Sequence, residues 1–361
     1  MRAVLVTFLL LLCGGLLSGA EFTTTIAPEL NAFFRKTNGW IGADGAYSIP
    51  LSRNKTLWLF SDTWIGTVRD GKRSDVKMIN NTIAIQEHGK EPQFYYRTNV
   101  HSAEAESLIK PEDGRGFYWL FDGAQTKDGV FFFLRQVEIV DHSSVFGFRG
   151  FSTSLARIKN PKDDPMKWRI EQLKFPFAEY NGKDSITFGS AVMKDKGFVY
   201  IYGNNSGPEK AVKGMIVARV PERKFASFDD WRFFSNGKWT TDFKSATPIS
   251  DETASEASVS YWPALKKYVF VHTQSIWGKV MLRTADKPSG PWSEPTLLYE
   301  CPEMKYPSKV FCYAGKAHPQ LSSKRDELII TYASNSFDVG EVIKDARLYF
   351  PHFLRVKAAK K

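Results

Sequence analysis

Short alternating runs of hydrophobic and polar residues recur along the chain after residue 40, whereas long amphipathic helical patterns are almost absent. Five apolar runs each follow a turn rich in Gly, Lys, Asp or Asn, which is typical of a hairpin. They cover residues 56–60, 129–133, 198–202, 268–272 and 328–332. A further run follows each, at 83–85, 154–158, 217–220, 281–284 and 353–356. The pattern predicts five units of three or four antiparallel strands.

The spacing of a recurring arginine indicates the length of one unit. The arginines in the later runs lie 62, 64 and 72 residues apart: Arg157, Arg219, Arg283 and Arg355. Regular units with turn signals at this spacing are typical of a β-propeller. We therefore predict an all-β fold, a single five-bladed β-propeller over residues 21–361. A pair of β-sandwiches is the alternative, but it does not explain the repeated order of strands, arginine and loop.

The N-terminus has the layout of a secretory signal. Arg2 precedes an apolar run at 3–12, and small residues follow at 17–20. We predict a signal peptide over 1–20 and a secreted or periplasmic protein. A membrane anchor is the alternative, but the run is short for a bilayer span and no later run has that length.

Export changes how the three cysteines are interpreted. Cys13 leaves with the signal, so Cys301 and Cys312 remain, eleven residues apart. In an oxidising compartment they are expected to form a disulfide, and two buried thiols are the alternative.

The composition of the chain limits the classes of binding partner. Aromatic residues make up 14% of the chain, which favours strands. The net charge of +10 is compatible with nucleic acid, a membrane surface or an acidic polymer. Because Lys and Arg are scattered through the turns, nucleic acid is disfavoured and an acidic polymer remains. We expect a monomer.

Polar residues gather where a propeller would place its channel opening. Asp44, Asp62 and Glu256 are the candidate catalytic carboxylates. Carboxylates framed by aromatic side chains suit glycoside hydrolysis, in which one protonates the leaving oxygen and another activates water. Candidate substrate-binding residues are Asp122, Trp40, Trp64, Trp119, Asn204, Gln274, His318 and Asn335. Taken singly, each acidic residue reads more simply as a turn residue, so the argument rests on their convergence.

The opening motif carries a family resemblance. Residues 38–51 and 56–64 resemble the first blade of the DUF4185 and DUF5005 families, which are similar to the five-bladed propellers of glycoside hydrolase family 43. Some relatives of the former are endo-D-arabinanases of family 183. The resemblance implies that Asp44 and Asp62 are paired catalytic aspartates and that Glu256 has the blade position of a general acid. It also implies that His318 lies where such propellers often hold calcium, although no cofactor is required.

These observations lead to one hypothesis with two assignments of roles. The protein is predicted to be a secreted glycoside hydrolase acting on a furanose- or pentose-containing, arabinan-like polysaccharide or oligosaccharide, which is either neutral or acidic. Either Asp44 is the base or nucleophile and Glu256 the acid, with Asp62 or Asp122 tuning them, or Asp44 and Asp62 are themselves the acid–base pair. A non-catalytic carbohydrate-binding propeller is the main alternative, and a scaffold for protein partners is the weaker one.

Overall fold

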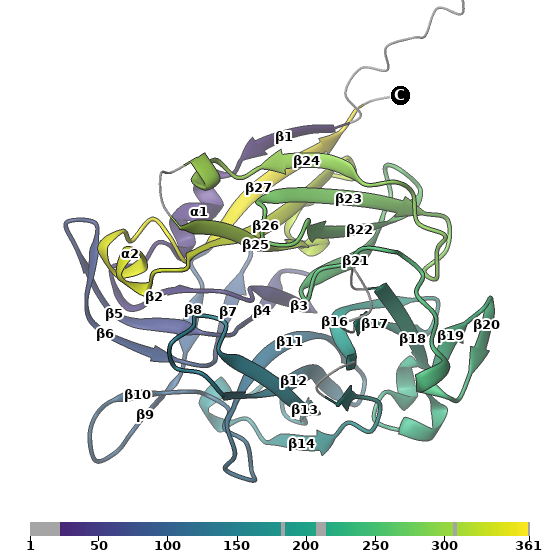
Figure 1. The fold of residues 1–361 in the computed structure, drawn as a ribbon, viewed down its shortest axis with the longest axis horizontal. Coiled ribbons are helices and arrows are strands. Elements are labelled where there is room, and N and C mark those ends of the chain that lie inside the picture. Colours follow the sequence, from purple (N-terminus) through teal and green to yellow (C-terminus); the bar gives the residue numbers. More distant parts are fainter. Residues whose placement is uncertain (1–21, 182–184, 207–213, 306–308, 360–361) are drawn as a thin grey trace, which may run out of the picture.

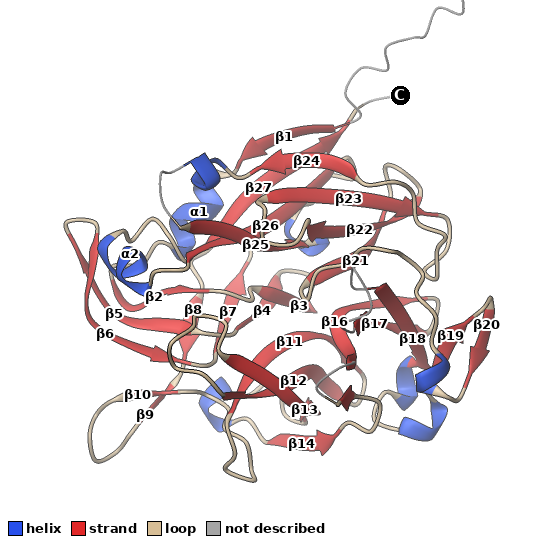
Figure 2. Ribbon diagram, viewed as in Figure 1, coloured by secondary structure: helices blue, strands red, loops and turns tan. Residues whose placement is uncertain are grey.

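The computed structural model describes residues 22–181, 185–206, 214–305 and 309–359. The predicted signal peptide at 1–20 lies outside these residues. The described chain is mostly β, as Figure 2 shows, with two short α-helices, α1 (Pro28–Phe34) and α2 (Val339–Lys344), and six 3-10 helices of three or four residues. Neither helix, nor any other in the described part, has the length and apolar character needed to cross a membrane.

Five antiparallel sheets carry the fold. The first has the order β3 (Tyr47–Ser52), β4 (Lys55–Phe60), β7 (Thr82–Glu87) and β8 (Gln93–Tyr95). The second has the order β11 (Phe117–Thr126), β12 (Gly129–Ile139), β13 (Phe148–Ile158) and β14 (Ile170–Lys174). The third has the order β15 (Glu179–Tyr180), β16 (Ser185–Asp195), β17 (Phe198–Ser206), β18 (Gly214–Pro221), β19 (Arg232–Ser235) and β20 (Lys238–Thr240).

The last two sheets complete this set. The fourth has the order β21 (Ala257–Trp262), β22 (Lys267–Thr273), β23 (Lys279–Ala285) and β24 (Thr296–Glu300). The fifth has the order β25 (Val310–Ala317), β26 (Glu327–Ser336), β27 (Pro351–Ala358) and β1 (Phe22–Ile26). Two smaller sheets pair β2 (Asn38–Ala43) with β5 (Thr63–Arg69) and β6 (Lys72–Ile79), and β9 (Arg97–Thr98) with β10 (Ala105–Glu106).

One strand of each large sheet faces the middle of the molecule. β3 packs beside β11, β11 beside β16, β16 beside β21, and β21 beside β25. Ser48 of β3 and His318, just after β25, join the first and last sheets through a hydrogen bond of 2.6 Å. In Figure 1 these strands surround the centre of the molecule.

The two ends of the chain meet in the fifth sheet. β1 pairs antiparallel with β27, so that Phe22 lies opposite Ala358. Arg355 of β27 forms ion pairs with Glu29 and with the buried Glu327, which ties α1 to this sheet. An early segment therefore closes the structure on the last strands.

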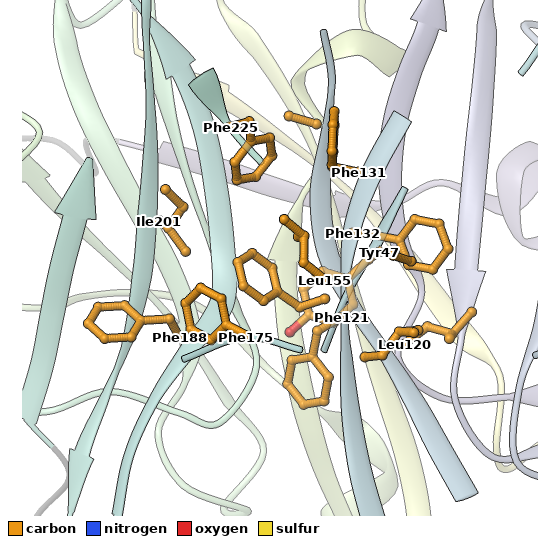
Figure 3. Packing of buried hydrophobic residues seen from close by; sticks show 14 of the residues in the cluster. Tyr47, Leu120, Phe121, Phe131, Phe132, Leu155, Phe175, Phe188, Ile201 and Phe225 are labelled. Carbon is orange, nitrogen blue, oxygen red and sulfur yellow. The ribbon is translucent and has the colours of Figure 1, made fainter. Parts of the chain in front are cut away.

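The core lies between neighbouring sheets. In β12, the consecutive residues Phe131, Phe132 and Phe133 are all buried, because both faces of this strand pack against other elements. Figure 3 shows Phe131 of β12 close to Phe225, which lies in the turn that follows β18, and Phe132 close to Tyr47 of β3. A strand buried on both faces reads as a continuous apolar run, which is what the sequence has here.

The sequence pattern correctly located the main strands. The five predicted first runs lie in β4, β12, β17, β22 and β26, and the five runs that follow lie in β7, β13, β18, β23 and β27. The predicted all-β class is thus confirmed.

Candidate active site

A cavity of about 1240 Å³ lies where loops from all five large sheets converge. All three predicted catalytic carboxylates, Asp44, Asp62 and Glu256, line it. We call it the carboxyl cavity. Its rim is apolar and includes Met78, Ile139 and Phe146, all of them exposed large hydrophobic residues. This volume exceeds the roughly 300–1,000 Å³ of ordinary small-molecule pockets, so the cavity has room for an extended ligand.

Asp44 and Asp62 are held together by the backbone of two turns. Asp44 follows β2, and Asp62 follows β4. The Asp44 N–H donates to the Asp62 carbonyl at 3.2 Å, and the Ser61 N–H donates to the Asp44 carbonyl at 3.2 Å. Between them, Gly45 has φ +80°, which favours glycine. The two turns that carry Asp44 and Asp62 are therefore joined, and they present both carboxyl groups to one cavity.

The surroundings of the Asp44 carboxyl group raise its pKa. Burial, and then the nearby charges of Asp62 and Glu256, raise its pKa well above the ordinary value. The Tyr313 hydroxyl donates to its Oδ2 at 2.6 Å, and a hydrogen bond with Tyr349 adds to this, both of which oppose the rise. Its Oδ1 is buried and has no hydrogen-bond partner among the described residues. The surroundings of Asp44 therefore favour its protonated form more than water would.

Asp62 has a different environment. Burial raises its pKa to about 6, and two N–H donors oppose that rise. Trp119 Nε1 donates to its Oδ1 at 2.9 Å, and Asn80 Nδ2 donates to the same oxygen at 3.1 Å. With a pKa of about 6, Asp62 is largely ionised at neutral pH, beside Asp44, whose pKa is raised well above its ordinary value. Two carboxyl groups with different proton states are the arrangement that acid–base catalysis needs.

Glu256 is engaged in a buried ion pair. Lys316 Nζ lies 3.1 Å from its Oε1, and the lysine side chain is only 1% exposed. The same ammonium lies 4.4 Å from the Tyr47 ring centroid. Burial lowers the pKa of Lys316, and the charges of Glu256, Asp44 and Asp122 oppose this. Glu256 is engaged by an ammonium, whereas Asp44 and Asp62 form no ion pair among the described residues, so the geometry favours the hypothesis in which Asp44 and Asp62 share the acid–base work.

Arg73 fixes the segment that carries Tyr349. Its guanidinium is buried and donates to the carbonyl oxygens of Ile41 at 3.1 Å, Val342 at 2.6 Å and Leu348 at 2.6 Å. Burial lowers the pKa of Arg73 to about 10, so it stays charged at neutral pH. Leu348 directly precedes Tyr349, whose φ is +64°. Arg73 therefore positions the tyrosine that contacts Asp44.

We expect Arg73→Lys to lower the free energy of unfolding by about 2–4 kcal/mol, because a single ammonium cannot reach carbonyls spread over a planar fork and each unpaired buried carbonyl costs about 1–3 kcal/mol. Urea unfolding measures this. Arg69→Lys, at an exposed position of the same hairpin, is the matched control and should change stability by less than about 0.5 kcal/mol. Equal losses of unfolding free energy in both variants would show that the hydrogen bonds of Arg73 do not hold this segment in place.

The predicted binding residues separate into three groups. The carboxyl cavity brings together four of them: Trp64, Trp119, Asn204 and Asn335. Their roles in binding remain predictions.

Two predicted binding residues lie elsewhere. Trp40 is 2% exposed, stacks on Phe94 with ring centroids 4.3 Å apart and donates to Thr82 Oγ1 at 3.2 Å. It is a core residue, and the expectation that it binds substrate is wrong. Gln274 lies in the turn after β22 and lines neither cavity described here.

Asp122 and His318 line a second cavity of about 550 Å³ and not the carboxyl cavity. A bulge in β11 between Leu120 and Gly123 turns Asp122 this way, and its oxygens accept from the Gly123 and Val192 N–H groups at 2.8 and 2.6 Å. Burial raises the pKa of Asp122 to about 7. The prediction that Asp122 and His318 share one opening with the catalytic carboxylates is therefore wrong.

His318 does not fit the expected calcium site. Its Nδ1 is bonded to the Ser48 hydroxyl at 2.6 Å and its Nε2 to the Thr331 hydroxyl at 2.8 Å. Calcium takes six to eight oxygen ligands, whereas His318 belongs to no group of three metal-binding side chains in the described chain. Burial, and then the charge of Lys316, lower the pKa of His318 to about 3, so it acts as a neutral structural residue.

Cys301 and Cys312 are free thiols, both buried, rather than the expected disulfide. They lie within hydrogen-bonding reach in an apolar cluster, and burial raises the pKa of the Cys301 thiol. The alternative of two buried thiols is the one observed.

Sequence reasoning missed Tyr313, Tyr349, Lys316 and Arg135. One sequence signal was available for Lys316. It lies inside the apolar run 310–317, and burying a charged lysine in such a strand is costly unless an opposite charge pairs with it.

One protein family matches almost the whole chain. Residues 28–358 match the model of the domain of unknown function DUF5005, which confirms the predicted resemblance to that family; the resemblance to DUF4185 stays a prediction. No curated protein matches the sequence significantly.

Solved structures share the fold. A Bacteroides ovatus protein, named as a candidate hydrolase, is 20% identical, with 93% of this chain and 90% of that chain covered and a TM-score of 0.74. RS223 β-xylosidase is 14% identical, with 90% and 95% covered and a TM-score of 0.50. A family 43 enzyme from Xanthomonas citri is 12% identical, with 92% and 93% covered and a TM-score of 0.48. At these identities the first two likenesses describe the fold alone.

Proposed function

The chain belongs to the DUF5005 family, and from that premise we propose that it is a secreted glycoside hydrolase whose five large sheets are the blades of a β-propeller. The observation that carries this proposal is the carboxyl pair Asp44 and Asp62, which are joined by backbone hydrogen bonds and line one cavity, where burial raises the pKa of both. We further propose that the substrate is a furanose- or pentose-containing, arabinan-like polysaccharide. In support of a pentose, one protein of similar fold is a β-xylosidase.

In the proposed reaction Asp44 donates its proton to the glycosidic oxygen as the bond from that oxygen to the anomeric carbon breaks. Asp62 accepts a proton from the water that attacks the anomeric carbon, so that one water is consumed and each carboxyl group changes its proton state once. Tyr313 and Tyr349 hydrogen-bond to Asp44 and stabilise the carboxylate that it becomes. Trp119 and Asn80 orient Asp62.

The walls of the cavity suit a sugar. Polar atoms that line it are buried without hydrogen-bond partners in the described chain: Trp64 Nε1, Asn204 Oδ1 and Thr273 Oγ1. Such atoms cost free energy unless a ligand or water satisfies them, and sugar hydroxyls can both donate and accept. Aromatic rings complete the site, since Trp119 packs edge-on against Phe148 with centroids 4.7 Å apart.

A polysaccharide panel tests the proposal. Arabinan, arabinoxylan, xylan, galactan and polyuronate are incubated with the wild-type protein and with Asp62→Asn, and new reducing ends are measured. We expect release from a pentose-containing polymer by the wild type and loss of release in Asp62→Asn. Binding of a polymer without release from any of them would instead identify a non-catalytic carbohydrate-binding propeller.

The pH dependence distinguishes the roles of the carboxyl groups. Activity should rise as the pH increases through about 6, because Asp62 must be ionised, and should fall at higher pH as Asp44 loses its proton. In Glu256→Gln, one charge that raises the pKa of Asp44 is absent. The alkaline limb of kcat should therefore move to lower pH, while the acid limb stays near 6. An unmoved alkaline limb, with kcat reduced more than 100-fold, would assign the proton donor to Glu256 instead.

A further inference from the structure

Arg135 is the one cation in the lining of the carboxyl cavity without a carboxylate partner among the described residues. The other lining arginine, Arg149, is paired with Glu138 at 2.7 Å. Arg135 Nη2 is buried and has no hydrogen-bond partner in the described chain. Arg135 as a whole is half-buried, but a buried guanidinium nitrogen without a hydrogen-bond partner is costly, so its presence at this wall calls for an anionic ligand.

The surroundings of Arg135 hold the guanidinium in place. It lies over the Phe121 ring, 4.2 Å from the centroid, which is a cation–π contact. Its stem packs against Gly150, where an added Cβ would stand 3.5 Å from Arg135 Cδ and 3.2 Å from Tyr180 Cε1. The side chain is therefore ordered in advance, which lowers the entropic cost of binding a ligand.

The strand pairing places Arg135 beside the catalytic pair. Arg135 of β12 lies directly opposite Trp119 of β11, and directly paired residues have side chains on the same face of a sheet, about 5 Å apart at Cβ. Trp119 donates to Asp62. A group bound by Arg135 thus lies about one side chain away from the residue that touches the proposed base.

We propose that Arg135 recognises the carboxylate of a uronic acid residue next to the scissile bond, so that the substrate is an acidic polysaccharide. A guanidinium fork matches a planar carboxylate with two parallel hydrogen bonds. The net charge of +10 is consistent with an acidic polymer. This inference rests on the proposed function and names its substrate class.

The test compares glucuronoarabinoxylan with the same polymer after its carboxyl groups have been reduced to alcohols, and adds a sulfated arabinan. For the wild type, kcat/KM should be roughly 10- to 100-fold higher on the acidic polymer than on the reduced one. Arg135→Gln should abolish this ratio, and Arg135→Lys should keep part of it. Arg219→Gln is the matched control, because Arg219 is also a half-buried arginine over an aromatic ring, 4.2 Å from the Trp239 centroid, but lies outside the cavity.

Each outcome separates this inference from the proposed function. Equal rates of the wild type on the acidic and reduced polymers, or an unchanged ratio in Arg135→Gln, would overturn the uronate site while leaving the hydrolase intact. An Arg135-dependent preference for sulfated arabinan alone would also overturn it, in favour of a sulfate ester. If no polymer is cleaved, the proposed hydrolase fails, and calorimetric binding of glucuronoarabinoxylan oligosaccharides to wild type and Arg135→Gln still decides the uronate site.

Discussion

Asp44→Asn is expected to lower kcat about 10²- to 10⁴-fold on whichever polysaccharide the wild type cleaves, since this is the usual contribution of a positioned general acid. The amide can still accept the hydrogen bond that Tyr313 donates at 2.6 Å, but it has no acidic proton to give. KM should change little, because the size and shape of the side chain are retained.

The folded state should not suffer from this substitution. Burial and two neighbouring carboxylates already disfavour the ionised form of Asp44, so a neutral amide avoids that cost. The melting temperature of Asp44→Asn should therefore equal or exceed that of the wild type. Functional sites often carry this kind of strain at the expense of stability.

A matched control is available in the same chain. Asp195 accepts a hydrogen bond from the Tyr268 hydroxyl at 2.8 Å but lines neither cavity. Asp195→Asn should keep full kcat. Full activity in a folded Asp44→Asn protein would rule out Asp44 as the proton donor.

Lys316→Met is expected to lower the free energy of unfolding by about 3–5 kcal/mol at pH 7. Lys316 is 1% exposed, and Glu256, its partner at 3.1 Å, has a side chain that is 15% exposed. Without the ammonium, Glu256 remains as an uncompensated charge near Asp44. Denaturant unfolding followed by intrinsic tryptophan fluorescence measures the loss.

Two further variants isolate the ion pair. Lys316→Met combined with Glu256→Gln should recover at least half of the lost stability, because the stranded charge is removed as well. Lys194→Met breaks a more exposed pair with Glu222 at 2.8 Å and should cost no more than about 1 kcal/mol. A double variant as unstable as Lys316→Met alone would show that packing, and not charge, explains the effect.

The strands and the carboxyl pair could be read from the sequence because their signals are local. Alternation in runs such as 56–60 and 328–332 reflects the two-residue period of a strand, which no distant contact has to supply. Asp62 closely follows the run 56–60, and the predicted blade opens at Asp44, so placing the strands of this blade also placed the pair at one opening.

Departures from regular strand geometry could not be read in this way. In a regular strand, residues 313 and 316 point to opposite faces. A register shift between Tyr313 and Lys316 instead lets one contact Asp44 and the other Glu256. The bulge at Asp122 and the end of β25 just before His318 likewise moved two predicted residues to the second cavity.

The sequence by itself determined the all-β class, the order of the main strands and the convergence of three carboxylates, because hydrophobic alternation and turn chemistry act over a few residues. Only the tertiary structure decided which carboxyl groups have raised pKa values, which one is paired with Lys316, and that Arg135 has no carboxylate partner among the described residues. Those properties depend on burial and on charges from distant segments, which meet only when the sheets have packed around the centre of the molecule.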